Sequence, residues 1–92
     1  MLQEFRVELS DMDVTPTQAG VLLYVQRYPG TYRQRVADAF ELDASWTGTV
    51  VRALQHKGWL RKKRARQDDR YALLTVTRKG SDLVGKILTL EK

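Results

Sequence analysis

The sequence contains no cysteine, which excludes both a disulfide framework and a thiolate metal site. It has no apolar run near the roughly 18 residues that a membrane span needs. A single histidine, His56, with scattered acids makes neither a catalytic triad nor a transition-metal site. The chain also lacks a nucleophile elbow and a glycine-rich phosphate loop. We therefore predict no enzyme activity, no metal, no cofactor and no membrane partner.

Proline and glycine are sparse, and no repeat or low-complexity linker divides the 92 residues. We predict one domain over residues 1–92, with a core over residues 14–80 and short terminal helical segments at 1–13 and 81–92. The segment "MLQEFRVELSDMD" is mixed and acidic, unlike a signal or transit peptide. The expected location is therefore the cytoplasm.

Positive charge is concentrated in one part of the chain. Residues 1–43 carry four cations and seven acids, a net −3, whereas residues 57–80 carry nine cations and two acids, a net +7. The densest stretch, "RKKRARQDDR", covers residues 61–70. Such a concentration indicates a polyanionic partner, with a solvated charged face as the alternative.

Three helices are predicted before residue 58. "TPTQ" makes a capping box of Thr15 and Gln18 at the start of the first helix, and "PG" ends that helix. "TYRQ" repeats the pattern with Thr31 and Gln34, and predicts a short second helix. Asp43 or Ser45 caps the third, which spans about residues 43–57. We interpret four aromatic residues as core or core-edge: Tyr24, Tyr28, Tyr32 and Trp59.

After Gly58 the apolar period changes from helical to alternating. "WLRKKR" and "YALLTV" predict two strands, with Leu60 inward on the first. The basic stretch then forms the loop end of a hairpin, and Thr77 caps a last helix. The predicted fold is mostly α with a small β-hairpin, in the order of a winged helix-turn-helix. In that arrangement a helix enters the DNA major groove while a basic hairpin straddles the backbone.

From Val14 to about Leu83 the chain resembles the DNA-binding domain of the MarR family of transcriptional regulators. The resemblance rests on "VTPTQAGVLLYV", "LDASWTGTVVRALQHKGWLRK" and "DDRYALLTVTRKG" in that order. In the last stretch "DDR" matches the family's Asp-x-Arg of the wing, and "TRKG" matches its Thr-x-x-Gly. The resemblance implies a transcriptional regulator that binds double-stranded DNA sequence-specifically. Its recognition helix, about 43–57, would lie in the major groove, and its wing, 61–70, on the backbone and minor groove.

Departures from the family pattern concern the ends and the turn. The chain looks like a short form without the long flanking helices that build the family's dimer and ligand pocket. A homodimer remains the expectation, through apolar terminal segments that include Leu2, Phe5, Val84 and Leu88. The alternative is that these segments only close the core of the monomer. The residues do not say whether a small-molecule effector binds. Glu41 stands where the family often has a glycine.

Candidate phosphate contacts lie on the basic hairpin and at the start of the second helix. They are Arg61, Lys62, Lys63, Arg64, Arg66 and Arg33. Arg70 is either a minor-groove reader or a partner of Asp68 or Asp69 that rigidifies the wing.

Candidate contacts on the third helix are Ser45, Trp46, Gly48, Thr49 and Arg52. The alternative role of Ser45 is to cap the helix. For Trp46 three contacts are left open: with DNA, with a dimer partner or with its own domain. Gly48 costs about 1 kcal/mol relative to alanine, which close approach of a phosphate or backbone would explain. The alternatives to specific DNA binding are a winged-helix module that binds protein and a non-specific nucleic-acid binder.

Overall fold

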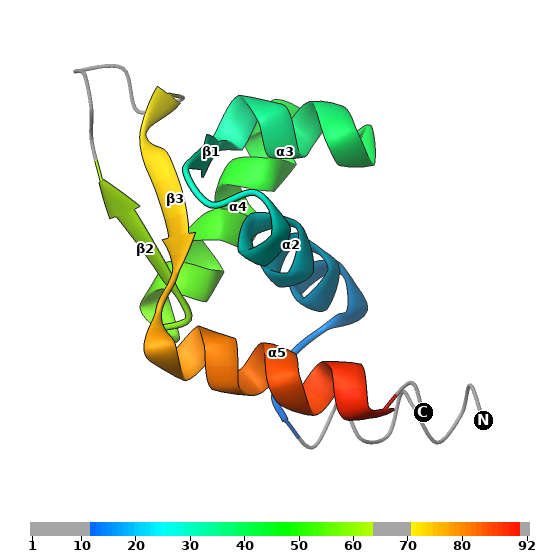
Figure 1. Ribbon diagram of the computed structural model, residues 1–92. Coiled ribbons are helices and arrows are strands. Elements are labelled where there is room, and N and C mark those ends of the chain that lie inside the picture. The colour runs from blue at the N-terminus through cyan, green and yellow to red at the C-terminus, as the bar shows by residue number, and fades with distance from the viewer. Residues whose placement is uncertain (1–11, 64–70, 91–92) are drawn as a thin grey trace.

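The computed structural model describes residues 12–63 and 71–90, and is drawn in Figure 1. Its elements are α2 (Pro16–Arg27), β1 (Thr31–Tyr32), α3 (Arg33–Phe40), α4 (Ala44–His56), β2 (Leu60–Lys63), β3 (Leu73–Val76) and α5 (Arg78–Leu90). The mostly helical fold with a small antiparallel sheet is confirmed, and the strand β1 is an addition to it. The predicted helical segment at residues 1–13 lies largely outside the described residues, and so does the tip of the predicted wing, residues 64–70.

The start of α2 forms as its sequence predicts. The hydroxyl of Thr15 accepts a hydrogen bond from the Gln18 amide (3.1 Å), and the Gln18 side chain accepts one from the Thr15 amide (3.0 Å). Pro16 occupies the first turn, where a missing N–H costs nothing. Along the helix, Val21, Leu22 and Val25 are fully buried in the core.

The second predicted capping box is wrong. Thr31 and Tyr32 form β1, which pairs antiparallel with β3 in the register Thr31 with Leu74. Tyr32 is the N-cap of α3, and no side chain in the described structure caps that helix. The side chain of Gln34 instead donates to Asp38 one turn later (3.0 Å). Strand pairing has drawn Thr31 into the sheet, so its hydroxyl is not placed for capping.

The turn between α3 and α4 uses a left-handed residue. Glu41 has φ 53° and ψ 43°, a conformation that suits glycine better than glutamate. Asp43 then caps α4, because its carboxylate accepts from the amides of Ser45 (2.9 Å) and Trp46 (3.2 Å). Of the two predicted caps, the structure therefore has Asp43.

The end of α4 is a turn that reverses the chain into β2. Gly58 has φ 80°; its amide donates to Gln55 and the Trp59 amide donates to Leu54 (3.0 Å), the pair of bonds of a Schellman motif. The sheet order is β1-β3-β2, with Leu60 opposite Val76 and Lys63 opposite Leu73. Leu60 is buried in the core as predicted, and Ala72 and Leu74 are buried as well.

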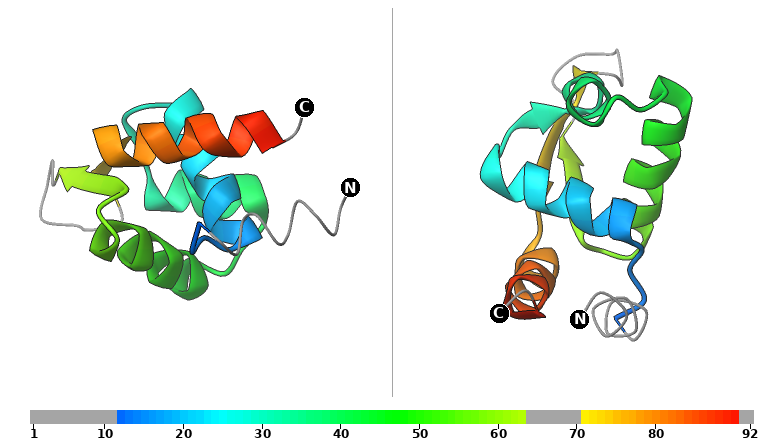
Figure 2. Two further views of the ribbon diagram at one scale, coloured as in Figure 1. Left: turned by 90° about the horizontal axis from the view of Figure 1, so that it is seen from below. Right: turned by 90° about the vertical axis from the view of Figure 1, so that its right-hand side faces the viewer.

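The core lies between α2, α4, α5 and the inner face of the sheet. Its members are apolar residues from every helix of the described chain and from β2 and β3, together with Val14 and Trp59. Trp59 is buried as expected, but Tyr28 is 51% exposed and does not belong to the core. In the right-hand view of Figure 2, α4 lies on one side of the domain, and β1 and the C-terminal end of α2 lie on the other.

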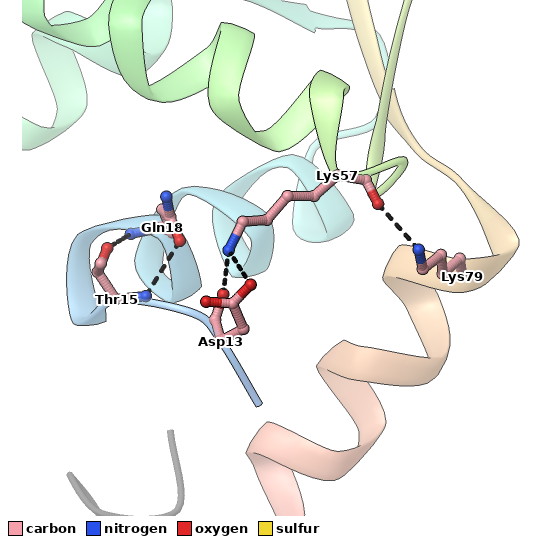
Figure 3. A network of polar contacts seen from close by, with 5 residues as sticks. All are labelled: Asp13, Thr15, Gln18, Lys57 and Lys79. Atoms are coloured by element: carbon pink, nitrogen blue, oxygen red, sulfur yellow. Dashed lines mark hydrogen bonds and ion pairs between the residues drawn. The ribbon is translucent and has the colours of Figure 1, made fainter. Parts of the chain in front are cut away.

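Polar contacts tie the C-terminal end of α4 to the two neighbouring segments (Figure 3). The amino group of Lys57 forms an ion pair with the carboxylate of Asp13 (2.9 Å) and donates to the Asp13 carbonyl. Lys79 of α5 donates to the Lys57 carbonyl (3.1 Å). A cation near a helix C-terminus is also favoured by the helix dipole. These contacts fix how α4 sits relative to the rest of the domain.

Candidate nucleic-acid interface

The outward face of α4 carries a ladder of exposed polar side chains. The hydroxyl of Thr49 donates to the Ser45 carbonyl (3.3 Å), and Arg52 donates to the Thr49 hydroxyl (3.4 Å). These residues recur at helical spacing, and all three are exposed. Trp46, in the first turn of the same helix, is 52% exposed. Its indole is therefore not folded away against its own domain.

Gly48 lies beneath two arginine side chains. It is buried, and a Cβ added to it would come within 3.0 Å of Nη1 of Arg33 and 3.3 Å of Nη1 of Arg52. The glycine therefore leaves room for two guanidinium groups to lie over the helix backbone. This explains the mid-helix glycine by packing within the chain, where the sequence suggested a phosphate or backbone approaching from outside.

A small, partly enclosed cleft is centred on this point. It is lined by Arg33 from the start of α3, by Gly48, Arg52 and Gln55 from α4, and by Lys62 from β2, with Ala72 and Leu74 beneath. Three cationic side chains from three different elements thus surround one cleft. Their positive charges converge on this point of the surface, and guanidinium and ammonium groups bind anions through charge-assisted hydrogen bonds.

Among the cations of the basic hairpin that the structure describes, Lys62 lies beside α4. Side chains alternate along a strand, so Lys62 shares the inward side of β2 with buried Leu60. Arg61 and Lys63 are exposed and lie on the opposite face of the strand. The structure therefore brings Lys62 together with Arg33 and Arg52, and places Arg61 and Lys63 away from that cleft. Three further candidates, Arg64, Arg66 and Arg70, lie outside the described residues, as do Asp68 and Asp69.

Sequence reasoning did not select Gln55, which lines the cleft. Gly48, Arg52 and Gln55 are four and three residues apart, so they share one face of α4. That spacing was visible in the sequence. What was not visible is that Lys62 of β2 lies across this face.

His56 is exposed near the end of α4. None of the helices in the part of the chain that the structure describes is both long and apolar enough to cross a membrane.

The fold and this surface define a winged helix-turn-helix protein: α3 and α4 form the helix-turn-helix, and β2 and β3 form the wing. The comparisons assign the family. Residues 12–70 match the sequence model of the MarR family, and the chain belongs to that family.

Among curated proteins, the chain is similar to the HTH-type transcriptional regulator BilQ of Clostridium symbiosum (strain WAL-14163). The two are 29% identical over 69 residues, which cover 75% of this chain and 48% of BilQ. The chain thus spans about half the length of that relative.

Two solved structures show the same fold over nearly the whole chain. A crystal structure of MarR has 29% sequence identity and a TM-score of 0.86, covering 98% of this chain and 64% of the MarR chain. A MepR–DNA complex of S. aureus has 22% identity and a TM-score of 0.84, covering 97% of this chain and 66% of that chain. The second likeness concerns the fold alone.

Proposed function

We propose that this chain is a sequence-specific, double-stranded DNA-binding transcriptional regulator acting in the cytoplasm. In this proposal α4 lies in the major groove and the wing follows the DNA backbone. The observation that carries it is the cleft where Arg33, Arg52 and Lys62 meet over Gly48. The cleft lies between the helix and the wing, where a duplex that contacts both elements presents its backbone.

The cations around the mouth of the cleft suit one phosphate group of a duplex lying over it. Guanidinium and ammonium groups bind phosphate oxygens through charge-assisted hydrogen bonds. The first turn of α3 adjoins it and, within the described residues, has no side-chain cap. Uncapped amide groups at a helix N-terminus also favour an anion. Arg33 and Lys62 therefore serve affinity, because phosphate contacts carry no direct sequence information.

The outward face of α4 serves sequence discrimination. Ser45, Trp46 and Thr49 present hydroxyl groups and one indole, all exposed and within two turns. Hydroxyls pair with base edges in the major groove, and an apolar surface contacts the thymine methyl. Arg52 lies between this face and the cleft, so it can reach either a base edge or a phosphate.

A salt titration of duplex affinity tests the proposal. The logarithm of the affinity should fall linearly with the logarithm of salt concentration, with a slope of about −0.9 for each phosphate contact. Arg33→Ala and Lys62→Ala should each weaken all duplexes alike and reduce the slope by about 1. The matched control is Arg78→Ala, since Arg78 is exposed on α5 away from the cleft. Negligible duplex affinity at low salt would instead favour the protein-binding module.

Selection from a random duplex pool then separates a specific regulator from a non-specific binder. We expect an enriched motif with the wild-type chain, and a changed motif with Thr49→Ala or Trp46→Ala. Recovery of no motif would leave only non-specific binding.

We also propose that the protein acts as a homodimer. Within α5, Leu83, Val84 and Ile87 are buried but Leu88 is 49% exposed. An exposed leucine beside a buried apolar stripe is suited to contact with a second copy. A dimer would place two α4 helices about 34 Å apart, one turn of DNA. Light scattering of the wild type and Leu88→Glu tests this, and a monomeric wild type would reject it.

A further inference from the structure

A second cationic surface lies where α2 ends, β1 passes and α3 begins. It is an open depression that we call the tyrosine–arginine surface, formed chiefly by Tyr24, Arg27, Tyr28, Thr31, Tyr32 and Arg35. Its two charged side chains are both arginines, and no acidic residue is among those that the structure describes as lining it. Both arginines are exposed, and Tyr28 is 51% exposed.

This surface faces away from the proposed DNA contacts. Arg33 and Arg35 are two residues apart on α3, about 200° around the helix at 3.6 residues per turn. Arg33 lines the cleft beside α4, so Arg35 points to the other side. In the right-hand view of Figure 2, β1 and the C-terminal end of α2 lie on the opposite side from α4. A duplex bound to α4 would leave the tyrosine–arginine surface open.

The two arginines are held in place by tyrosine rings. The guanidinium of Arg27 lies 5.5 Å from the ring centre of Tyr28, and that of Arg35 lies 5.6 Å from the ring centre of Tyr32. Nε of Arg35 also donates to the Tyr32 hydroxyl (3.3 Å), and this hydrogen bond raises the pKa of Arg35 above its ordinary value. Side chains ordered before binding lose less conformational entropy when a partner arrives.

The tyrosines are themselves ordered by contacts with one another. The ring centres of Tyr24 and Tyr28 lie 4.9 Å apart, and that of Tyr32 lies 5.3 Å from that of Tyr71. Tyrosine and arginine are the residue types that most often dominate protein–protein binding energy. The surface thus has the composition of a protein interface.

Thr31 also lines the depression. The residue is 7% exposed, and its hydroxyl, which has no hydrogen-bond partner in the described structure, is closed to solvent. It therefore offers no contact to a docked partner, and the groups available for binding are the exposed side chains of Arg27, Tyr28 and Arg35.

We propose that the tyrosine–arginine surface docks an acidic segment of a partner protein, with carboxylates meeting Arg27 and Arg35. Charge complementarity carries the choice of partner, because the lining combines two cations with hydroxyl donors. A nucleic-acid backbone is the weaker match, since it needs a row of cations along its path and here there are two. The proposal goes beyond DNA binding and does not require it.

The test uses a short labelled peptide of Asp, Glu and Leu, and a second peptide with Asn and Gln in place of the acids. Binding is measured by anisotropy to the full chain carrying Arg61→Gln, Lys62→Gln and Lys63→Gln, which weakens the competing basic hairpin. On that background, Arg27→Glu with Arg35→Glu should lower affinity for the acidic peptide about tenfold or more. The matched control, Arg78→Glu with Lys86→Glu, has the same net charge and should leave it unchanged. Circular dichroism checks that every variant is folded.

Three results would overturn the proposal. The first is equal loss in the Arg27/Arg35 variant and the control, because binding would then follow net charge alone. The second is equal binding of the amide peptide, and the third is no binding at all. Displacement of the peptide by single-stranded DNA from the hairpin-substituted chain would reassign the surface to nucleic acid. Because no arm needs a bound duplex, failure of duplex binding leaves this test intact.

Discussion

The carbonyl oxygen of Trp59 occupies the space beside Gly80 that a side chain would need. A Cβ placed on Gly80 would lie 2.2 Å from that oxygen and 2.8 Å from Cγ1 of Val76. Thr77 fastens the same junction, since its amide donates to the Trp59 carbonyl (3.0 Å) and its hydroxyl donates to the Gly58 carbonyl (2.6 Å). The hydroxyl also accepts from the Gly80 amide (3.0 Å), as predicted for a helix cap. The start of α5 is thereby held against the turn that ends α4.

Substitution of Gly80 by alanine should destabilise the protein. The added methyl must displace a backbone carbonyl, and such overpacking lowers the free energy of unfolding by about 1–3 kcal/mol. Gly85 is the matched control, because it lies in the same helix with open space around its Cβ position. Gly85→Ala should raise the free energy of unfolding by about 0.5–1 kcal/mol through helix propensity. Urea unfolding measures both, and changes of the same sign would contradict the packing argument.

Substitution of Glu41 by glycine should stabilise the turn before α4. Glu41 is held at φ 53°, and a left-handed conformation costs a residue with a side chain about 1–2 kcal/mol. Glycine removes that penalty but gains entropy in the unfolded chain, so we expect a net increase of about 0.5–1 kcal/mol. Glu41→Ala is the control, since it removes the charge and keeps the strain. A gain in the alanine variant equal to that in the glycine variant would point to charge instead of backbone strain.

Local signals in the sequence predicted those features whose partners are close along the chain. The Thr15 capping box formed because both of its partners lie within four residues of each other. The same pattern at Thr31 failed because β3, far along the chain, pairs with that segment. A capping pattern alone does not indicate whether a distant strand pairs with the same segment.

The candidate site was predictable in its residue types and less so in its geometry. The basic stretch identified Lys62, and helical periodicity identified Thr49 and Arg52. Alternation along β2 with Leu60 inward already places Lys62 on the opposite face from Arg61 and Lys63, but its position beside Arg33 and Arg52 depends on how the helices pack against the sheet and was not foreseen. The covering of Gly48 by two arginines depends on long side chains from two helices, and the sequence pattern does not encode it.

The ion pair between Asp13 and Lys57 should add modest, salt-sensitive stability. The Asp13 side chain is 89% exposed, and exposed pairs contribute about 0.2–1 kcal/mol. Asp13 also has φ 60°, so Asn is the suitable replacement because it tolerates that conformation. Asp13→Asn should lower the free energy of unfolding by about 0.5 kcal/mol at low salt, and by less at high salt. A double-mutant cycle with Lys57→Met isolates the pair, and a coupling energy of zero would dismiss it.

Gly48 offers a substitution that tests how the two arginine side chains above it respond to a methyl group. Alanine is the better helix former by about 1 kcal/mol, and its methyl would press on the ends of two flexible arginine side chains rather than on backbone. We therefore expect Gly48→Ala to fold with equal or higher stability. Arg33 and Arg52 must give by only a few tenths of an ångström to admit the methyl, so duplex binding should weaken slightly, by about twofold, equivalent to about 0.4 kcal/mol.

The salt dependence makes this prediction specific. Both arginines keep their charge and need to move by only a few tenths of an ångström, so the slope of log affinity against log salt should stay nearly unchanged. Gly85→Ala serves as the control, since it alters helix propensity in α5 without touching the cleft. A slope shallower by about 2 in a stably folded Gly48→Ala protein would contradict this expectation, because both guanidinium groups would then have lost a phosphate contact.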